Sequence, residues 1–155
     1  MTSDLLAPTG STPVPCPTSL PARRRLPETL EAPAHARRFV HDVLCRDHGT
    51  DARGAAQLVA SEMVTHAVLY GRPPFEIAVV CRTWDIRLTV NDGGNDDQEV
   101  TDPADLLRVL LLEKIARAGG AEVTSHGKAR WYVIPTGYVP GPRRRSWRGE
   151  GGRPG

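Results

Sequence analysis

The chain has 155 residues, of which 39% are hydrophobic, and its formal net charge is +2. This length supports one hydrophobic core and not two, and so small a charge does not argue for nucleic-acid binding across the domain. No apolar run approaches membrane length and the N-terminal segment has no signal-peptide core, so we expect a cytoplasmic protein without a membrane partner. Cys16, Cys45 and Cys81 are odd in number and widely spaced, which is typical of reduced thiols.

Prolines and arginines concentrate at the two ends of the chain. We expect residues 1–23 to form a disordered Pro/Ser/Thr-rich head, residues 24–136 one folded domain, and residues 137–155 a disordered basic Gly/Pro/Arg tail. The tail carries Arg143-Arg144-Arg145-Ser146-Trp147-Arg148, a combination of charge and stacking that suits nucleic acids. Charge runs of this kind are more often solvated, so nucleic acid is not the expected partner.

The periodicity of apolar residues predicts helices and strands in a definite order. The predicted elements are a short strand near 25–30, helices over 33–47 and 51–70, two strands of which the second spans 85–90, a helix that includes a leucine-rich stretch at 106–112, and strands at 121–125 and 129–134 joined by a turn at 126–128. This order predicts an α/β two-layer sandwich with a mixed, mostly antiparallel sheet covered on one face by helices.

The helix predicted over 51–70 carries polar groups on an otherwise apolar element. Asp51 is a candidate N-cap, and Gly71 is a candidate stop. Glu62 and His66 are four residues apart, so they lie one above the other on a single face. The residues expected to rest on a sheet are Ala56, Val59, Ala60, Met63, Val64 and Ala67.

A second polar element follows the strand predicted over 85–90. Asp92-Gly93-Gly94 lies just past the strand end, where the glycines let a ligand approach the backbone and Asp92 can accept a hydrogen bond from an exocyclic amine. The alternative is an ordinary turn, because this sequence is also strong turn chemistry.

Together the two elements resemble a known family. Ser61-Glu62-Met63-Val64-Thr65-His66-Ala67-Val68 and Asp92-Gly93-Gly94 are similar in order and spacing to the motifs of GHKL (histidine kinase/HSP90-like) ATP-binding domains, especially bacterial anti-sigma-factor serine/threonine kinases. The resemblance covers residues 33 to 135. It implies binding of ATP with Mg²⁺, a catalytic or water-organising role for Glu62, and adenine recognition by Asp92 and Gly94. The family's metal-ligating Asn corresponds to His66.

His66 is a departure with chemical consequences, because magnesium prefers oxygen ligands and an imidazole is a poor substitute. As the residue at the metal position, His66 either replaces the amide, donates a hydrogen bond to a phosphate, or caps a vacated pocket.

The phosphate end departs further from the family. The family's Gly-x-Gly-Leu segment is missing, since no glycine occurs between Gly94 and Gly119, and the segment from Asn95 to Asp102 is acidic. Asp102 is expected to cap a helix behind Pro103. Lys128 lies in a hairpin that resembles the family's glycine-containing hairpin, which often has Gly-Lys-Thr. As a point charge it is a candidate phosphate-binding residue; the alternative is an exposed hairpin lysine with no such role.

Metal ligands other than His66 are not expected. His35, His41, Asp42 and His48 fall on or near the first predicted helix without a second ligand cluster, so they are interpreted as its solvated face, and no zinc site is predicted.

Two functions remain open. The first is an ATP-binding regulatory protein that resembles anti-sigma-factor serine/threonine kinases and controls a partner, such as a sigma-like factor or an anti-sigma antagonist, by binding and, if the site is active, by phosphorylation. The second is a non-catalytic interaction module that has lost nucleotide binding. In that case the leucine-rich stretch at 106–112, which is more apolar than one buried face requires, would bind a partner or a second copy as a homodimer.

Overall fold

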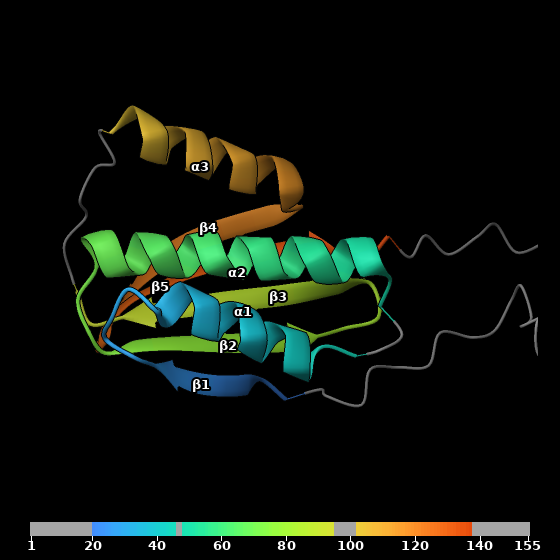
Figure 1. Ribbon diagram of the computed structural model, residues 1–155, viewed down its shortest axis with the longest axis horizontal. Helices are drawn as coiled ribbons and strands as arrows, with labels where there is room; N and C mark the ends of the chain where they lie inside the picture. Colours follow the sequence, from blue (N-terminus) through green and yellow to red (C-terminus); the bar gives the residue numbers. More distant parts are fainter. Residues whose placement is uncertain (1–19, 46–47, 95–101, 138–155) are drawn as a thin grey trace, which may run out of the picture.

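The computed structural model describes residues 20–45, 48–94 and 102–137 (Figure 1). The elements are β1 (Ala22–Leu26), α1 (Ala32–Val43), α2 (Thr50–Tyr70), β2 (Phe75–Cys81), β3 (Asp85–Asp92), α3 (Pro103–Ile115), β4 (Ala118–Thr124) and β5 (Gly127–Pro135). Nearly all of the predicted head and tail, and most of the acidic segment after Asn95, lie outside these residues. β1 begins two residues before the boundary predicted for the folded domain.

The five strands form one sheet in the order β1-β2-β3-β5-β4. Each of the four pairings among the described strands is antiparallel, so the sheet contains no parallel pair in this part of the chain. Pairing of β3 with β5 sets Asp92 opposite Lys128 and Val90 opposite Arg130. Residues that are far apart in sequence therefore meet at one end of the central strands.

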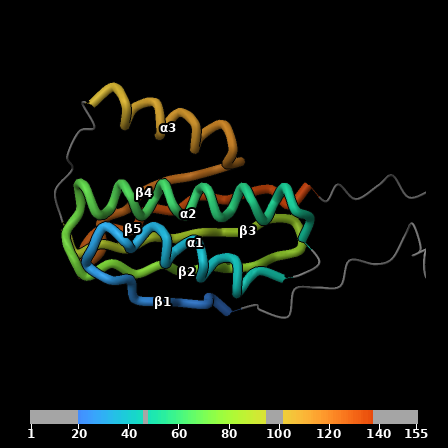
Figure 2. The backbone as a smooth tube through the Cα atoms, in the orientation of Figure 1, coloured from blue at the N-terminus to red at the C-terminus, as the bar shows by residue number. Residues whose placement is uncertain are grey.

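The helices cover one face of this sheet, as the expected two-layer sandwich requires. In Figure 1 and in the tube of Figure 2, α1 lies over the β1–β2 side, α2 lies over the centre, and α3 lies beyond α2 on the side of β4. The core is formed by alternate residues of the strands and by the inner sides of α1 and α2. Ile86, Leu88 and Val90 of β3 are all buried there, as their alternation predicted.

The second helix follows its sequence pattern closely. All six apolar residues expected to rest on the sheet are buried. The N-cap is Gly49 and not Asp51; Asp51 instead lies in the first turn, where a carboxylate interacts favourably with the helix dipole. The helix ends at Tyr70, and Gly71 is its C-cap residue, as expected.

The first helix is shorter than predicted, and this changes the position of His48. α1 ends at Val43, and Leu44 is extended, so His48 does not belong to the helix. His35 and His41 are exposed as expected, but His48 is only 8% exposed, so its assignment to the solvated face was wrong. In its buried position His48 contacts Cys81, which is 33 residues away in sequence. Helical spacing does not predict such a contact.

The remaining boundaries shift by a few residues. Asp102 caps α3 as predicted, since its side chain accepts a hydrogen bond from the N–H of Ala104 at 2.9 Å. The turn between β4 and β5 is at Ser125 and His126, and Gly127 already belongs to β5, where it pairs with Thr124. None of the helices in the described ranges combines the length and apolarity that a bilayer crossing needs.

Candidate functional site

A cavity of about 220 Å³ opens where the C-terminal end of α2 meets the ends of β3 and β5. Four of the five predicted site residues line it: His66 from α2, Asp92 and Gly94 from the end of β3, and Lys128 from β5. His66 and Lys128 are more than 60 positions apart in sequence. The register of β3 and β5 brings Lys128 next to Asp92. The fifth, Glu62, does not line the cavity.

Asp92 is held by the two glycines that follow it and by the end of α2. Its Oδ1 accepts a hydrogen bond from the N–H of Gly94 at 2.8 Å, and the N–H of Gly93 donates to the carbonyl oxygen of Arg72 at 2.6 Å. A Cβ added at Gly71 would lie 2.9 Å from Oδ2 of the same carboxylate. The missing side chain at position 71 therefore makes room for the carboxylate of Asp92.

Gly127 fixes how closely β5 approaches Asp92. Its φ of +144° lies in a region that L side chains rarely adopt, and a Cβ there would collide with the carbonyl oxygen of Asp92. This close approach places Lys128 directly opposite Asp92 in the ladder and within the cavity lining.

His66 carries a buried ring nitrogen. Its Nε2 has no hydrogen-bond partner among the described residues, and its ring lies 5.0 Å from the ring of Tyr70. Burial of the imidazole, together with the nearby charge of Arg130, lowers the pKa of His66 from 6.5 to about 4. The side chain is therefore neutral at pH 7, and it presents an unsatisfied polar atom that a ligand could satisfy.

Sequence reasoning missed two cations of the lining, Arg72 and Arg130. Together with Lys128 they set three positive side chains against the single carboxylate of Asp92, so the lining favours an anion. Arg130 could have been found by extending the β5 alternation from Lys128 by two residues, since both then face the same side. Arg72 follows a helix stop, and no motif marks it.

Glu62 faces α3 instead of the cavity. One of its carboxylate oxygens, Oε2, is buried without a hydrogen bond and lies 3.4 Å from Nε of Arg108, which also reaches Asp105 at 3.3 Å. Arg108 is thus an ion-pair partner between two helices. The Glu62 carboxylate is thus paired with a cation of α3 and does not belong to the cavity lining, and its catalytic role stays a prediction.

Two other polar residues of the same helix segment, Ser61 and Thr65, have local partners. The hydroxyl of Thr65 donates to the carbonyl oxygen of Ser61 at 2.8 Å, and Arg37 of α1 donates to the hydroxyl of Ser61 at 3.3 Å. The first contact lies within α2 and the second joins α2 to α1. Neither Ser61 nor Thr65 belongs to the cavity lining.

Comparison with known proteins supports the architecture. The chain is similar to "The crystal structure of the RsbU and RsbW domains of Rv1364c from Mycobacterium tuberculosis", with a TM-score of 0.50 and 16% sequence identity. The match covers 75% of this chain and 33% of that one, so the chain matches about a third of that structure's length. None of the protein-family models matches this chain, and no curated protein matches it.

The likeness is one of fold. At this identity it shows the two-layer α/β fold and does not transfer the chemistry of any residue.

Proposed function

We propose that this chain is a cytoplasmic ATP-binding regulatory protein that resembles anti-sigma-factor serine/threonine kinases and controls a partner protein by binding it. The observation that carries the proposal is the convergence of His66, Asp92, Gly94 and Lys128 on one cavity with a positively charged lining. These are the same residues that the sequence resemblance assigns to nucleotide binding. If Asp92-Gly93-Gly94 were only an ordinary turn, there would be no reason for these residues to meet at one cavity.

The end of the cavity at Asp92 supports a purine base. Asp92 lines the cavity with its carboxylate next to Gly71, and Val90 and Met63 supply apolar walls. An acceptor beside apolar walls suits a flat ring that carries an exocyclic amine, as adenine does. At about 220 Å³ the cavity is smaller than typical sites for drug-sized ligands, so we expect it to hold the base and ribose with the phosphates at its rim.

The residues near His66 do not fit a magnesium ion. The cavity lining offers one carboxylate, Asp92, which already accepts from Gly94, and three cations that would repel a divalent metal. Glu62 is paired with Arg108. We therefore propose that Lys128, Arg130 and Arg72 hold the phosphates directly, with His66 as a neutral hydrogen-bonding group.

Calorimetric titration tests the proposal. ATP and ADP should produce binding heat with the wild-type chain, and adding Mg²⁺ should change the affinity by less than about threefold because the cavity has no oxygen cage for the ion. GTP should bind about tenfold more weakly or worse, because its base presents a carbonyl oxygen to Asp92 in place of an amine.

Asp92→Ala should abolish the heat while lowering the free energy of unfolding by about 1 kcal/mol, the value of one hydrogen bond to Gly94. Asp42→Ala is the matched control, because Asp42 is an exposed acid on α1. Absence of heat at millimolar ATP with folded wild type would remove nucleotide binding from the proposal.

The second candidate, an interaction module without nucleotide, is favoured by one specific observation. Four leucines of α3 are exposed by between 44% and 68%: Leu106, Leu107, Leu110 and Leu111. Only Leu112 and Asp105 of this helix are buried. We propose this set, the α3 leucine surface, as the partner-binding surface in either function. Nucleotide titration separates the two candidates, since only the first predicts heat.

A further inference from the structure

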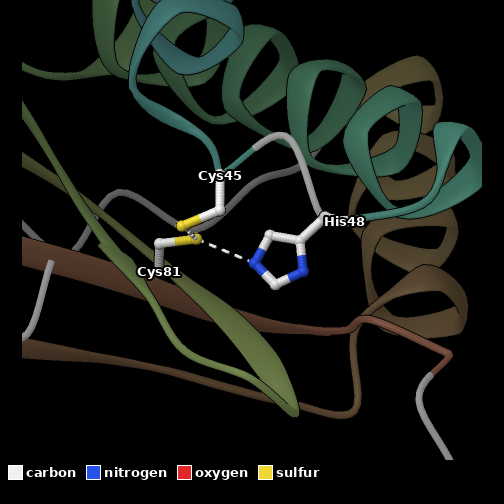
Figure 3. A group of neighbouring side chains, drawn as sticks. All are labelled: Cys45, His48 and Cys81. Carbon is white, nitrogen blue, oxygen red and sulfur yellow. Dashed lines mark hydrogen bonds between the residues drawn. The ribbon is translucent and has the colours of Figure 1, made fainter. Parts of the chain in front are cut away.

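A cluster of three metal-ligand side chains lies away from the cavity. Cys45 follows α1, His48 precedes α2, and Cys81 ends β2 (Figure 3). The Nε2 of His48 lies 2.8 Å from the Sγ of Cys81, and that Sγ lies 3.1 Å from the Sγ of Cys45. The cluster sits near the first turn of α2, whereas the cavity is at the last turn, so the two are at opposite ends of this helix.

We propose that Cys45, His48 and Cys81 form a zinc site that joins the α1–α2 connection to the sheet. Among the common cellular divalent ions, Zn²⁺ is the one that best suits a donor set of two thiolates and one imidazole. Two thiolates also neutralise the charge of the ion, so the bound site carries no net charge in the partly buried position that it occupies. A water on the side of Cys45, the most exposed of the three ligands, would complete a tetrahedral set.

The distances suit chelation with small side-chain movements. All three ligand atoms lie within 4.8 Å of one another. Around a tetrahedral zinc with Zn–S bonds of about 2.3 Å, two ligand sulfurs are about 3.7 Å apart. The sulfurs of Cys45 and Cys81 therefore need to separate by less than about 1 Å, which rotation about their side-chain bonds allows.

The backbone holds the first two ligands together. Cys45 and His48 have the spacing Cys-x-x-His, and the N–H of His48 donates to the carbonyl oxygen of Cys45 at 3.3 Å. Arg53 of α2 donates to the same carbonyl at 3.0 Å and to the carbonyl of His41 at 3.2 Å. This pinning orders the end of α1 before any metal binds, so only Cys81 has to be supplied by the sheet.

Metal uptake by the full-length, reduced chain tests the site. The protein is stripped with a chelator, kept reduced with a phosphine, and dialysed against zinc chloride or cobalt chloride. We expect one metal per chain, thiolate-to-cobalt charge-transfer bands, and the intense visible bands of tetrahedral cobalt. Zinc at 100-fold excess over its dissociation constant should raise the melting temperature by about 5–10 °C.

Variants and controls locate the ligands. Cys45→Ser, Cys81→Ser and His48→Gln should each weaken zinc binding by about 100-fold or more. Cys16→Ser removes the third thiol of the chain, and His41→Gln removes an exposed histidine of α1; both should bind as the wild type does. Equal binding by the site variants and by these controls would overturn the proposal.

A measurement on the wild type avoids variants that fail to fold. Zinc should protect Cys45 and Cys81 from alkylation, mapped by mass spectrometry, and leave Cys16 unprotected. Binding should also release close to two protons per zinc, measured by calorimetry in buffers of different ionisation enthalpy. Reduced protein that takes up no metal, and instead joins Cys45 to Cys81 as a disulfide on oxidation, would overturn the site.

Discussion

At the residue scale, His66 connects stability, pH and ligand binding. Its buried Nε2 lacks a hydrogen-bond partner in the described part of the chain, and this burial lowers the pKa of the side chain from 6.5 to about 4. A neutral imidazole without a partner costs folding free energy, and a phosphate or a ribose hydroxyl would recover it. The same residue stands where the helix motif that this segment resembles has an Asn.

The lowered pKa of His66 predicts a pH-dependent loss of stability. Between pH 6.5 and about 4 the unfolded chain binds a proton at this side chain and the folded chain does not, so the free energy of unfolding falls as pH falls through this window. Above pH 6.5 the group is neutral in both states and contributes no slope. Allowing for solvent screening of a partly exposed ring, we expect a loss of about 1–2 kcal/mol.

Urea unfolding of the wild type and His66→Asn at pH 7 and pH 4.5 measures this loss. The variant should lose less stability between the two values, because Asn does not titrate. His41→Asn is the control, since His41 is exposed on α1 and should leave the difference unchanged. Identical losses in the wild type and His66→Asn would show that His66 is not held neutral in the fold.

At the scale of elements, a substitution at Gly127 tests how closely β3 and β5 approach, and the same substitution at Gly54 of α2 is the control. Gly127→Ala would place a side chain against the carbonyl of Asp92 at a φ of +144°, so we expect a loss of about 2–4 kcal/mol in the free energy of unfolding. A Cβ at Gly54, in α2, would meet nothing within 4 Å, so Gly54→Ala should stabilise the chain by about 0.5–1 kcal/mol.

Thermal or chemical unfolding of both glycine variants provides the comparison. We expect the free energy of unfolding to fall for Gly127→Ala and to rise for Gly54→Ala. If Gly127→Ala leaves the free energy of unfolding unchanged, β3 and β5 lie farther apart next to Lys128 than the structure shows.

The docking of α3 on α2 depends on Arg108. This side chain lies between Glu62 of α2 and Asp105 of its own helix, and the carboxylate of Asp105 is only 6% exposed. Arg108→Met would leave both carboxylates without their cation, and we expect a loss of about 1–2 kcal/mol and faster amide exchange in α3.

Lys114→Met is the matched control for Arg108, because Lys114 is an exposed cation in the last turn of the same helix. It should change stability by less than about 0.5 kcal/mol. Equal effects of the two variants would indicate that the α2–α3 contact does not rest on this ion pair.

At the scale of the whole molecule, α3 lies to one side of the α1–α2 layer and leaves its leucines open. β4, on the same side of the sheet, is also largely exposed and is an edge strand. An apolar helix surface beside an edge strand is the part of this molecule best suited to another protein chain or to a second copy.

Substitutions on the α3 leucine surface test its role in association. Leu107→Asp with Leu111→Asp should abolish any concentration-dependent self-association seen by light scattering, and they should leave folding intact because both side chains are exposed. Leu30→Asp with Leu58→Asp is the matched control, since these leucines are exposed elsewhere. Self-association that persists in the α3 variant would place the contact on another surface.

The sequence by itself predicted the order of the helices and strands, and it selected four of the residues that line the cavity. Alternation buried Ile86, Leu88 and Val90, and helical spacing assigned the inner side of α2 correctly, because periodicity reports which side of an element meets the core. The motif resemblance selected Asp92 and His66 as site residues. These are local properties, set by neighbours within a few positions of the chain.

Only the tertiary structure decided which residues meet. The β3–β5 register placed Lys128 and Arg130 beside Asp92, α3 docking drew Glu62 to Arg108, and packing of β2 against the α1–α2 connection brought Cys81 to Cys45 and His48. Each of these contacts joins residues at least 33 positions apart. Their proximity depends on strand register and on helix docking, which arise from burial of the whole core and leave no periodic signal in the chain.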